Sequence, residues 1–307
     1  MKPHKDLRRF RGDCARAARI LRGMGTLHLG DNLPYMAAML AESVRLVYAD
    51  PPFGTKRTRA ARGGEYADSW ADPAAYVAWL RPRVAELRRL LAPDGTLYLH
   101  LDRRSVHHAR LLLDEVFGPL NFQNEIIWHY TGGGRGTRWL PHKHDNILVY
   151  HKGPSYIFNA DALREPYAPT SGYARGGIRS RSGKHYIPNP DGKLMDDVWR
   201  IPIVNPLSRE RTEYPTQKPE ALLRRIVLAS TNRGDLVLDP FCGSGTTAMV
   251  AQSLGREWVA IDSAPSAIEI TRTRLARLEH EKPASPEGET AKNLPQVGGD
   301  GSSPTRP

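Results

Sequence analysis

The sequence predicts an α/β fold, because short apolar runs that suit buried strands alternate with longer runs whose apolar residues fall at helical spacing. Two of the strands end in an acidic residue followed by proline, at Asp50 and Asp239, which is typical of the edge where open α/β sheets bind ligands. The predicted strands are residues 26–29, 44–49, 96–101, 125–130, 146–150, 236–239 and 258–261. The predicted helices are residues 33–40, 72–91, 105–117 and 220–230, a helix ending near 254, and residues 264–278.

Composition narrows the class of partner. The 307 residues hold 44 Lys and Arg against 33 Asp and Glu, a net charge of +11, which favours a polyanion such as nucleic acid over a basic surface without a partner. No apolar run is long enough to cross a membrane, and the start of the chain lacks the apolar core of a signal peptide, so we expect a cytoplasmic protein.

Neither the cysteines nor the histidines form a recognisable metal set. Cys14 and Cys242 are too few for a disulfide framework and lack metal-ligand spacing, which suits free thiols. The polar run at 142–145 has no spaced partner set and suits a solvated turn. We therefore predict no metal site.

The first predicted elements lead to a tight turn. Residues 1–25 are basic and weakly patterned, which suits a helix or a flexible arm. Residues 26–29 alternate like a short strand and run into Gly30-Asp31-Asn32. Asp31 has the residue type and the place of a helix N-cap, and a ligand contact is the other interpretation.

The strand at 44–49 ends in Asp50-Pro51-Pro52-Phe53, which has the most distinctive chemistry in the chain. An exocyclic amine on adenine or cytosine is a poor nucleophile because its lone pair is delocalised into the ring, so it needs hydrogen-bond acceptors. The Asp50 carboxylate and the Pro51 carbonyl suit that role, the prolines make the turn rigid, and Phe53 offers a stacking face for the base. The same four residues also fit an ordinary surface turn.

Polar sequence separates this turn from the next helix. Residues 54–70 are basic and contain glycine without any periodicity, and we predict a mobile loop that orders as a lid on substrate binding. Asp72-Pro73 is a helix start, after which apolar residues recur at helical spacing. The turn at 92–95 is expected to end this helix before the next strand.

A glycine-rich turn late in the chain indicates a nucleotide-like cofactor. Asp239 ends a strand, Gly243-x-Gly245 opens a helix, and Asp262 ends the following strand. Such a turn lets a ligand approach the backbone closely, and the second acid can hold the hydroxyls of a ribose. The pattern fits a nicotinamide cofactor as well as S-adenosylmethionine. A dehydrogenase places this turn in its first βα unit, whereas here it follows the Asp50 turn, which favours a cofactor plus a base.

Residues 152–212 break the α/β rhythm with many Pro, Gly, Ser, Tyr and Arg residues. Basic side chains interleaved with aromatic ones suit phosphate contacts and base readout, so we predict a recognition insert here. A long solvated excursion without a target is the alternative interpretation. The residues expected to contact DNA are Arg175, Arg179, Arg181 and Lys184.

With these residues in view, the chain resembles the β class of DNA amino-methyltransferases, which act on adenine N6 or cytosine N4. Asp50-Pro51-Pro52-Phe53 is similar to their catalytic motif, and Phe241-Cys242-Gly243-Ser244-Gly245 to their S-adenosylmethionine motif. Tyr214-Pro215-Thr216-Gln217-Lys218-Pro219 is similar to the segment before the cofactor motif. Catalytic motif, recognition region and cofactor motif follow one another in the order that defines this class, and the resemblance covers residues 26 to 280.

This resemblance implies a circularly permuted Rossmann-like class I methyltransferase fold, with S-adenosyl-L-methionine as cofactor and double-stranded DNA as partner. Together with the composition, it divides the chain into a basic arm (1–25), a catalytic half (26–151), a recognition insert (152–212), a cofactor half (213–281) and a tail (282–307) whose Pro, Gly and Ser content predicts disorder. The residues that it places at the cofactor are Asp31, Thr216, Lys218, Asp239, Phe241, Gly243, Gly245, Thr246 and Asp262.

The resemblance also implies the reaction, which is methyl transfer to adenine N6 in a short DNA sequence with the target base flipped out of the duplex. Asp rather than Ser at position 50 favours adenine over cytosine N4. Phe53 stands where tyrosine is commoner but keeps the stacking face, and Tyr214 stands where histidine is frequent. Methylation of cytosine C5 is not expected, because neither cysteine follows a proline in a catalytic turn. An RNA base as acceptor, a non-catalytic DNA-binding module and a nicotinamide oxidoreductase are the other hypotheses.

Two further expectations concern partners. Analogy with the family suggests a homodimer. We expect any restriction endonuclease that accompanies the protein to be a separate chain, because the sequence leaves no room for a nuclease domain. The recognition sequence depends on the three-dimensional placement of residues 152–212 and is not encoded in a readable pattern.

Overall fold

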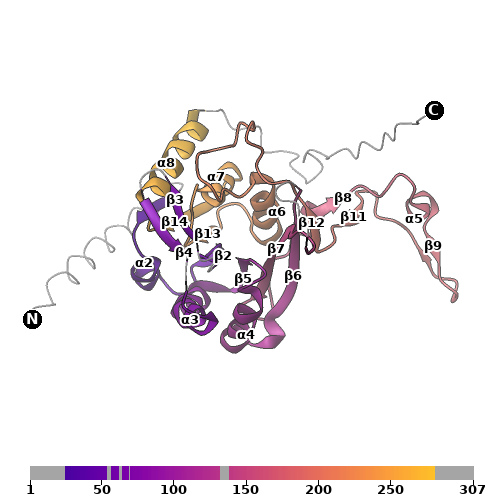
Figure 1. Ribbon diagram of the computed structural model, residues 1–307. Helices are drawn as coiled ribbons and strands as arrows, with labels where there is room; N and C mark the ends of the chain where they lie inside the picture. Colours follow the sequence, from indigo (N-terminus) through magenta and orange to yellow (C-terminus); the bar gives the residue numbers. More distant parts are fainter. Residues whose placement is uncertain (1–24, 54–56, 62–63, 69, 132–137, 281–307) are drawn as a thin grey trace, which may run out of the picture. The chain divides into compact units, whose positions relative to one another are not determined.

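The computed structural model describes residues 25–53, 57–61, 64–68, 70–131 and 138–280. The strands of its central sheet are β1 (Thr26–Leu29), β2 (Val44–Ala49), β5 (Leu91–Leu101), β6 (Phe122–His129), β7 (His144–His151), β12 (Val198–Arg200), β13 (Leu236–Asp239) and β14 (Glu257–Asp262). They lie side by side in the order β1-β14-β13-β2-β5-β7-β6-β12 (Figure 1). Strand β7 runs antiparallel to both of its neighbours, and the other neighbouring pairs are parallel.

Strands from the end of the sequence lie between strands from its start. Leu238 of β13 pairs with Val47 of β2, and β14 lies between β13 and β1. The two halves of the chain therefore share one sheet, which confirms the predicted permuted Rossmann-like fold. Because these four strands are parallel, their carboxyl ends meet at one edge of the sheet.

Helices cover both faces of this sheet (Figure 1). They are α2 (Asn32–Ala38), α3 (Pro73–Leu90), α4 (Val106–Phe117), α6 (Glu220–Ser230), α7 (Thr246–Ser253) and α8 (Pro265–His280). Successive residues of β2 point to opposite faces, so Val47 packs in the core with α2, α3 and α4, and Leu46 packs in the core with α6, α7 and α8. Within the described residues, no helix has the length and apolar character needed to span a membrane.

The predicted turn at 92–95 lies inside a strand instead of before it. Leu91 pairs with Val44 and the regular register resumes at Leu46 and Thr96, so the residues between form an irregularity in β5. A side chain at Gly95 would place its Cβ 3.0 Å from the carbonyl oxygens of Ala92 and Val44, so glycine permits this close backbone approach.

Within the mobile loop predicted at 54–70, residues 57–61 and 64–68 form strands, so the loop prediction was wrong for these residues. Strands β3 (Arg57–Ala61) and β4 (Gly64–Asp68) form an antiparallel hairpin, with a register from Arg57 opposite Asp68 to Ala61 opposite Gly64. Pairing of two strands satisfies their backbone groups whatever their side chains, and these two segments show no alternation of apolar and polar residues in the sequence that would reveal them. A lid role for this segment stays a prediction.

Residues 160–195 form a compact unit of their own. It contains η2 (Ala160–Leu163), the pair β8 (Arg164–Glu165) and β11 (Lys193–Leu194), helix α5 (Gly172–Gly176), and the pair β9 (Ile178–Arg179) and β10 (His185–Tyr186). The predicted insert 152–212 thus includes flanking residues of the larger unit, among them β12, which adds a parallel strand beside β6. The predicted tail, residues 282–307, lies outside the described residues, and so does the predicted arm, residues 1–25, except for its last residue.

Candidate functional site

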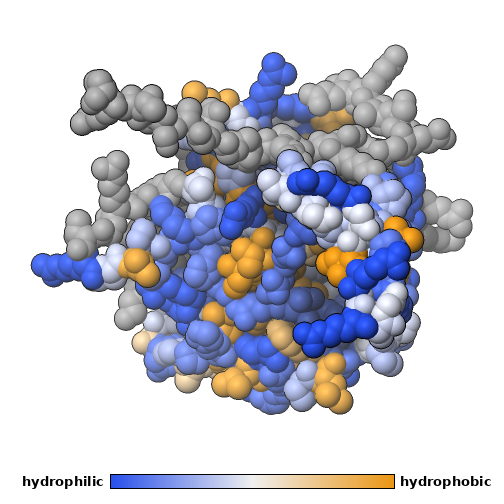
Figure 2. Space-filling model, turned by 90° about the vertical axis from the view of Figure 1, so that its right-hand side faces the viewer, coloured by the Kyte–Doolittle hydropathy of each residue, from blue (hydrophilic) through white to orange (hydrophobic). Residues whose placement is uncertain are grey.

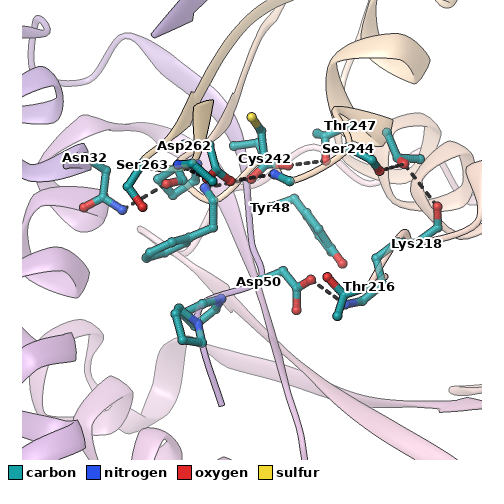
Figure 3. Close-up of a pocket in the computed structure, with 18 of the residues that line it drawn as sticks. Asn32, Tyr48, Asp50, Thr216, Lys218, Cys242, Ser244, Thr247, Asp262 and Ser263 are labelled. Atoms are coloured by element: carbon teal, nitrogen blue, oxygen red, sulfur yellow. Dashed lines mark hydrogen bonds and ion pairs between the residues drawn. The ribbon is translucent and has the colours of Figure 1, made fainter. Parts of the chain in front are cut away.

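A cavity of about 300 Å³ lies at the edge where β1, β14, β13 and β2 end (Figure 3). Every predicted catalytic residue and all but one of the predicted cofactor-binding residues line it. The predicted residues that line the cavity are Asp31, Asp50, Pro51, Pro52, Phe53, Thr216, Lys218, Asp239, Phe241, Gly243, Thr246 and Asp262.

Asp50 directly follows β2 and lies where a ligand in this cavity would meet a carboxylate. Its Oδ2 forms an ion pair with the Lys218 ammonium, which lies 5.5 Å from the centre of the Phe53 ring (Figure 3). Its Oδ1 is buried and has no hydrogen-bond partner among the described residues. An unsatisfied buried acceptor costs free energy, so this oxygen favours a ligand that brings an N–H or O–H donor.

The glycine turn is tied to the end of the next strand. The Asp262 carboxylate accepts hydrogen bonds from the backbone N–H groups of Gly243 (2.8 Å) and Ala264 (2.9 Å). Gly243 has φ +50°, and a Cβ there would lie 2.9 Å from the Tyr214 ring. Burial raises the pKa of Asp262. The turn therefore brings backbone and a carboxylate to the same wall of the cavity.

Asp239 lies between the two other strand-end acids. It accepts hydrogen bonds from the Phe241 N–H (3.0 Å) and the Thr247 hydroxyl (2.5 Å). Burial, with smaller contributions from the negative charges of Asp50 and Asp262, raises the pKa of Asp239 to about 7. With Asp31, four carboxyl groups line this cavity, which favours a ligand that carries positive charge.

Asp31 is the N-cap of α2, which confirms one of the two interpretations that the sequence allowed, and a ligand contact stays a prediction. Its Oδ1 caps α2 by accepting from the Leu33 N–H (2.8 Å), and the residue lines the cavity. Its Oδ2 forms an ion pair with Arg83 (2.7 Å), whose guanidinium lies over the Trp79 ring at 4.0 Å from the ring centre.

Several residues of the cavity wall were not predicted. Trp70 and Trp79 have ring centres 4.8 Å apart, and Trp79 lies 5.8 Å from Phe241, so an aromatic wall faces the Asp31 side of the cavity. In the sequence, Arg83 could have indicated this wall, because it is a charged residue within the apolar stripe of α3. In the structure its side chain is only 6% exposed. A charged residue on a core-facing position indicates a buried partner.

A buried polar chain also runs behind the Asp50 turn. The Tyr48 hydroxyl lies 2.8 Å from His100 Nδ1, and His100 Nε2 lies 3.4 Å from Asp145 Oδ2. The His100 ring also stacks on Phe53, with ring centres 6.1 Å apart. Burial, and then the nearby Asp50 charge, raises the pKa of Tyr48 well above its ordinary value. This chain fixes the orientation of the rings next to the turn.

The remaining predictions concern Gly245, metals and cysteines. Gly245 does not line the cavity, and a Cβ there would lie 2.4 Å from Thr271 Cγ2, so its place is a close contact between the start of α7 and α8. The described part of the chain holds no group of three or more His, Cys, Asp or Glu suited to a metal ion. Cys242 is a buried free thiol, and Cys14 lies outside the described residues.

The contact at Gly245 gives a prediction on stability. Gly245 has φ +76° and a blocked Cβ position, whereas Gly234 has φ +84° and no atom within 4 Å of its Cβ position. We expect Gly234→Ala to lower the free energy of unfolding by about 1 kcal/mol through backbone strain, and Gly245→Ala by about 3 kcal/mol, because overpacking adds to the same strain. Urea denaturation measures both values, and equal decreases would contradict the packing role.

Comparisons with known proteins agree with this geometry. Residues 44–273 match a family model described as DNA methylase. The type II methyltransferase M.HpaI of Haemophilus parainfluenzae is 33% identical over 238 residues, which cover 76% of this chain and 68% of that protein. The DNA adenine methyltransferase YhdJ of Escherichia coli is 32% identical over 257 residues, which cover 83% of this chain and 84% of that protein.

Solved structures share the fold. The cytosine-N4-specific PvuII DNA methyltransferase superposes with a TM-score of 0.61 at 17% identity, over 84% of this chain and 91% of that one. A DNA modification methylase of Thermus thermophilus, solved in complex with S-adenosyl-L-methionine, superposes with a TM-score of 0.54 at 24% identity, over 83% and 94%. At these identities the likeness concerns the fold alone.

Proposed function

We propose that this chain, which belongs to the DNA methylase family, transfers a methyl group from S-adenosyl-L-methionine to the N6 amine of adenine in double-stranded DNA. The observation that carries the proposal is the Asp50 carboxylate, which has a buried oxygen without a partner in the described structure and shares one cavity with the Gly243 turn. One cavity thus provides acceptors for an amine and a separate place for a cofactor.

The residues of the cavity suit S-adenosyl-L-methionine, which supplies an electrophilic methyl group on a positively charged sulfur. Asp262 offers carboxylate oxygens to ribose hydroxyls, and the aromatic wall of Trp70, Trp79 and Phe241 offers stacking faces to the adenine ring. Asn32 Oδ1 is buried without a partner among the described residues and suits a further donor of the ligand. Asp239 supplies negative charge near the cationic part.

The Asp50 turn would act on the target amine. Asp50 Oδ1 and the Pro51 carbonyl accept the two amine hydrogens, which holds the nitrogen lone pair away from the ring system and towards the methyl group. As the new C–N bond forms, the bond between the methyl carbon and sulfur would break and S-adenosylhomocysteine would leave. The amine would lose one proton, and Asp50 is the acceptor in contact with it. Lys218 holds the other Asp50 oxygen and so fixes the carboxylate in place.

Adenine is favoured over cytosine by two observations. Asp50 heads the catalytic turn, and the relative from Escherichia coli is named an adenine methyltransferase. Cytosine N4 is the second candidate, since the same acceptors suit its amine and the PvuII enzyme with this fold is cytosine-N4-specific. Either base has to leave the duplex to reach a cavity at the sheet edge, so base flipping is part of the proposal.

The nucleoside product separates the two bases. DNA from a bacterial host without DNA methyltransferases is isolated after expression of this chain, digested and resolved by mass spectrometry. We expect N6-methyladenine. N4-methylcytosine instead would show that the target base is cytosine, and the mechanism proposed for Asp50 would still apply.

The separate unit at 160–195 is proposed to contact DNA. Its four predicted residues are all exposed, with Arg175 in α5, Arg179 in β9, and Arg181 and Lys184 in the turn before β10. Lys184 also lies over the Tyr186 ring at 5.2 Å from its centre. A cationic hairpin with an aromatic ring suits phosphate and base contacts.

A charge-removal variant tests this DNA contact. We expect the quadruple change R175Q, R179Q, R181Q and K184Q to weaken DNA binding and to flatten its salt dependence, by about 0.9 in the slope of log K for each phosphate that the variant no longer neutralises. Cofactor affinity should not change. Fluorescence anisotropy with labelled duplex at several salt concentrations measures the slope. An unaltered slope would show that these four residues do not contact DNA phosphates.

The raised pKa of Asp239 predicts a pH dependence of cofactor binding. The free protein loses the Asp239 proton near pH 7, and a cationic ligand favours the charged carboxylate. The complex therefore holds fewer protons than the free protein below pH 7, so affinity should rise as the pH increases from 5.5 to about 7 and then level off. Calorimetry in buffers of different ionisation enthalpy should detect proton release at pH 6 that is absent in Asp239→Asn.

Partners beyond DNA follow from the family resemblance. We propose a homodimer, which light scattering of the purified protein tests. Any restriction endonuclease that accompanies the enzyme is proposed to be a separate chain.

A further inference from the structure

The connection between β12 and α6 begins at the far edge of the sheet (Figure 1). Two of its residues, Thr216 and Lys218, line the cavity. Strand β12 is parallel to β6, and β6 is parallel to β2 through the two antiparallel pairs with β7, so β12 ends at the same edge as Asp50. The chain then returns to the end of β2, where Lys218 pairs with Asp50. We name residues Asn205–Arg211 of this connection the rim loop.

Hydrogen bonds fix the conformation of the rim loop. Asn205 Oδ1 accepts from the Leu207 N–H (2.8 Å), its carbonyl accepts from the Ser208 N–H (2.9 Å), and the Ser208 carbonyl accepts from the Arg211 N–H (3.0 Å). These bonds close two successive turns. The loop thus has a defined shape before any partner binds.

A buried side chain ties the rim loop to the cavity wall. Gln217, which is only 6% exposed, donates to the Glu210 carbonyl (2.5 Å) and accepts from the Thr212 N–H (2.7 Å) and hydroxyl (2.9 Å). The Glu210 carboxylate turns inward and accepts from the Glu220 N–H (3.0 Å). Gln217 lies between Thr216 and Lys218, which both line the cavity, so its hydrogen bonds fix the position of the rim loop relative to the cavity.

The outward side of the rim loop carries two cations and one apolar residue. Arg209 and Arg211 are exposed and form no ion pair with any described residue, and Leu207 is 93% exposed. A single exposed leucine means little by itself, and Figure 2 shows several small apolar patches on one mainly hydrophilic face. The informative feature is the combination with two exposed guanidinium groups on a fixed loop that joins the cavity wall.

We infer that the rim loop grips the DNA beside the flipped target base. Arg209 and Arg211 bind backbone phosphates, whose charge they match, and Leu207 packs against the base stack from which the target base has left. This inference rests on the proposed function, because it takes duplex DNA as the partner of the cavity. The rim loop lies within the predicted recognition insert, residues 152–212, but it belongs to the larger unit, and the DNA contacts predicted from the sequence were at residues 175–184.

The phosphate contacts of Arg209 and Arg211 are tested by measuring DNA binding, which needs no methyl transfer. Anisotropy is measured on labelled duplex in the presence of S-adenosylhomocysteine, comparing the double variant R209Q and R211Q with R88Q and R277Q. The control arginines are exposed near the ends of α3 and α8, at the opposite edge of the sheet. We expect the slope of log K against log salt to fall by about two in the rim-loop variant and to stay unchanged in the control. Equal slopes in both variants would overturn the inference, whether or not the wild type methylates DNA.

The role of Leu207 is tested by comparing the variants Leu207→Ala and Leu120→Ala. Leu120 is the control because it is 97% exposed and lies just before β6 begins, at the opposite edge of the sheet. Duplexes carry one methylation site, read beforehand from methylated genomic DNA, with the target base either paired or opposite an abasic site. We expect Leu207→Ala to lower kcat/KM about tenfold on the paired duplex and much less on the abasic one, because unstacking there is already easier. A decrease of equal size on both duplexes, or no decrease, would exclude Leu207 from base flipping.

Discussion

Replacing Asp50 by alanine should reduce methyl transfer by at least about 10³-fold while leaving the affinity for S-adenosyl-L-methionine close to that of the wild type. The variant removes the acceptor oxygen that is buried without a described partner, and it also releases Lys218. The target amine then keeps its lone pair in the ring. Single-turnover transfer of labelled methyl to DNA, with cofactor affinity from calorimetry, measures both quantities.

The conservative variant provides the control for this prediction. Asp50→Asn keeps one carbonyl oxygen as an acceptor but loses the charge that pairs with Lys218, so its rate should lie between those of alanine and wild type. Alanine and asparagine rates near the wild-type value would show that Asp50 does not take part in the reaction. A parallel decrease in cofactor affinity would instead indicate that the change had disturbed the cavity.

Replacing Asp262 by alanine should lower cofactor affinity by about 100-fold, because two charge-assisted hydrogen bonds to hydroxyl groups account for that difference. The change also removes the acceptor for the Gly243 and Ala264 N–H groups, which loosens the glycine turn. Calorimetric titration with S-adenosyl-L-methionine measures the affinity, and urea denaturation shows whether the fold persists.

Glu257→Ala is the matched control, since Glu257 begins the same strand, β14, at the opposite edge of the sheet. It should leave cofactor affinity unchanged. If Asp262→Ala binds the cofactor as tightly as this control does, the ribose contact assigned to Asp262 is wrong.

The cavity was largely predictable because its key residues belong to short local patterns. Asp50, Gly243 and Asp262 each lie at or just after the end of a buried strand, and parallel strands bring such ends together whatever their order in the chain. The sequence could not show that β13 would pair with β2, but the resemblance to a permuted fold implied it, and Val47 opposite Leu238 confirms it.

The parts that escaped prediction depend on contacts between distant residues. Neither Arg83 nor Trp79 of α3 was predicted from the sequence to be a site residue, and their contacts with Asp31 and Phe241 bring them to the cavity. The chain from Tyr48 through His100 to Asp145 joins three strands, and its register follows from sheet pairing that no local pattern encodes. Strands β3 and β4 have no alternation of apolar and polar residues in their sequence, so hydrophobic periodicity could not predict them.

The proposed reaction can be measured as transfer of labelled methyl from S-adenosyl-L-methionine to unmethylated genomic DNA by the purified protein alone. We expect label to enter DNA until every target site is modified, and to appear on the N6 amine of adenine after digestion. Binding of both the cofactor and DNA without any incorporation of label would contradict the claim that this cavity carries out methyl transfer.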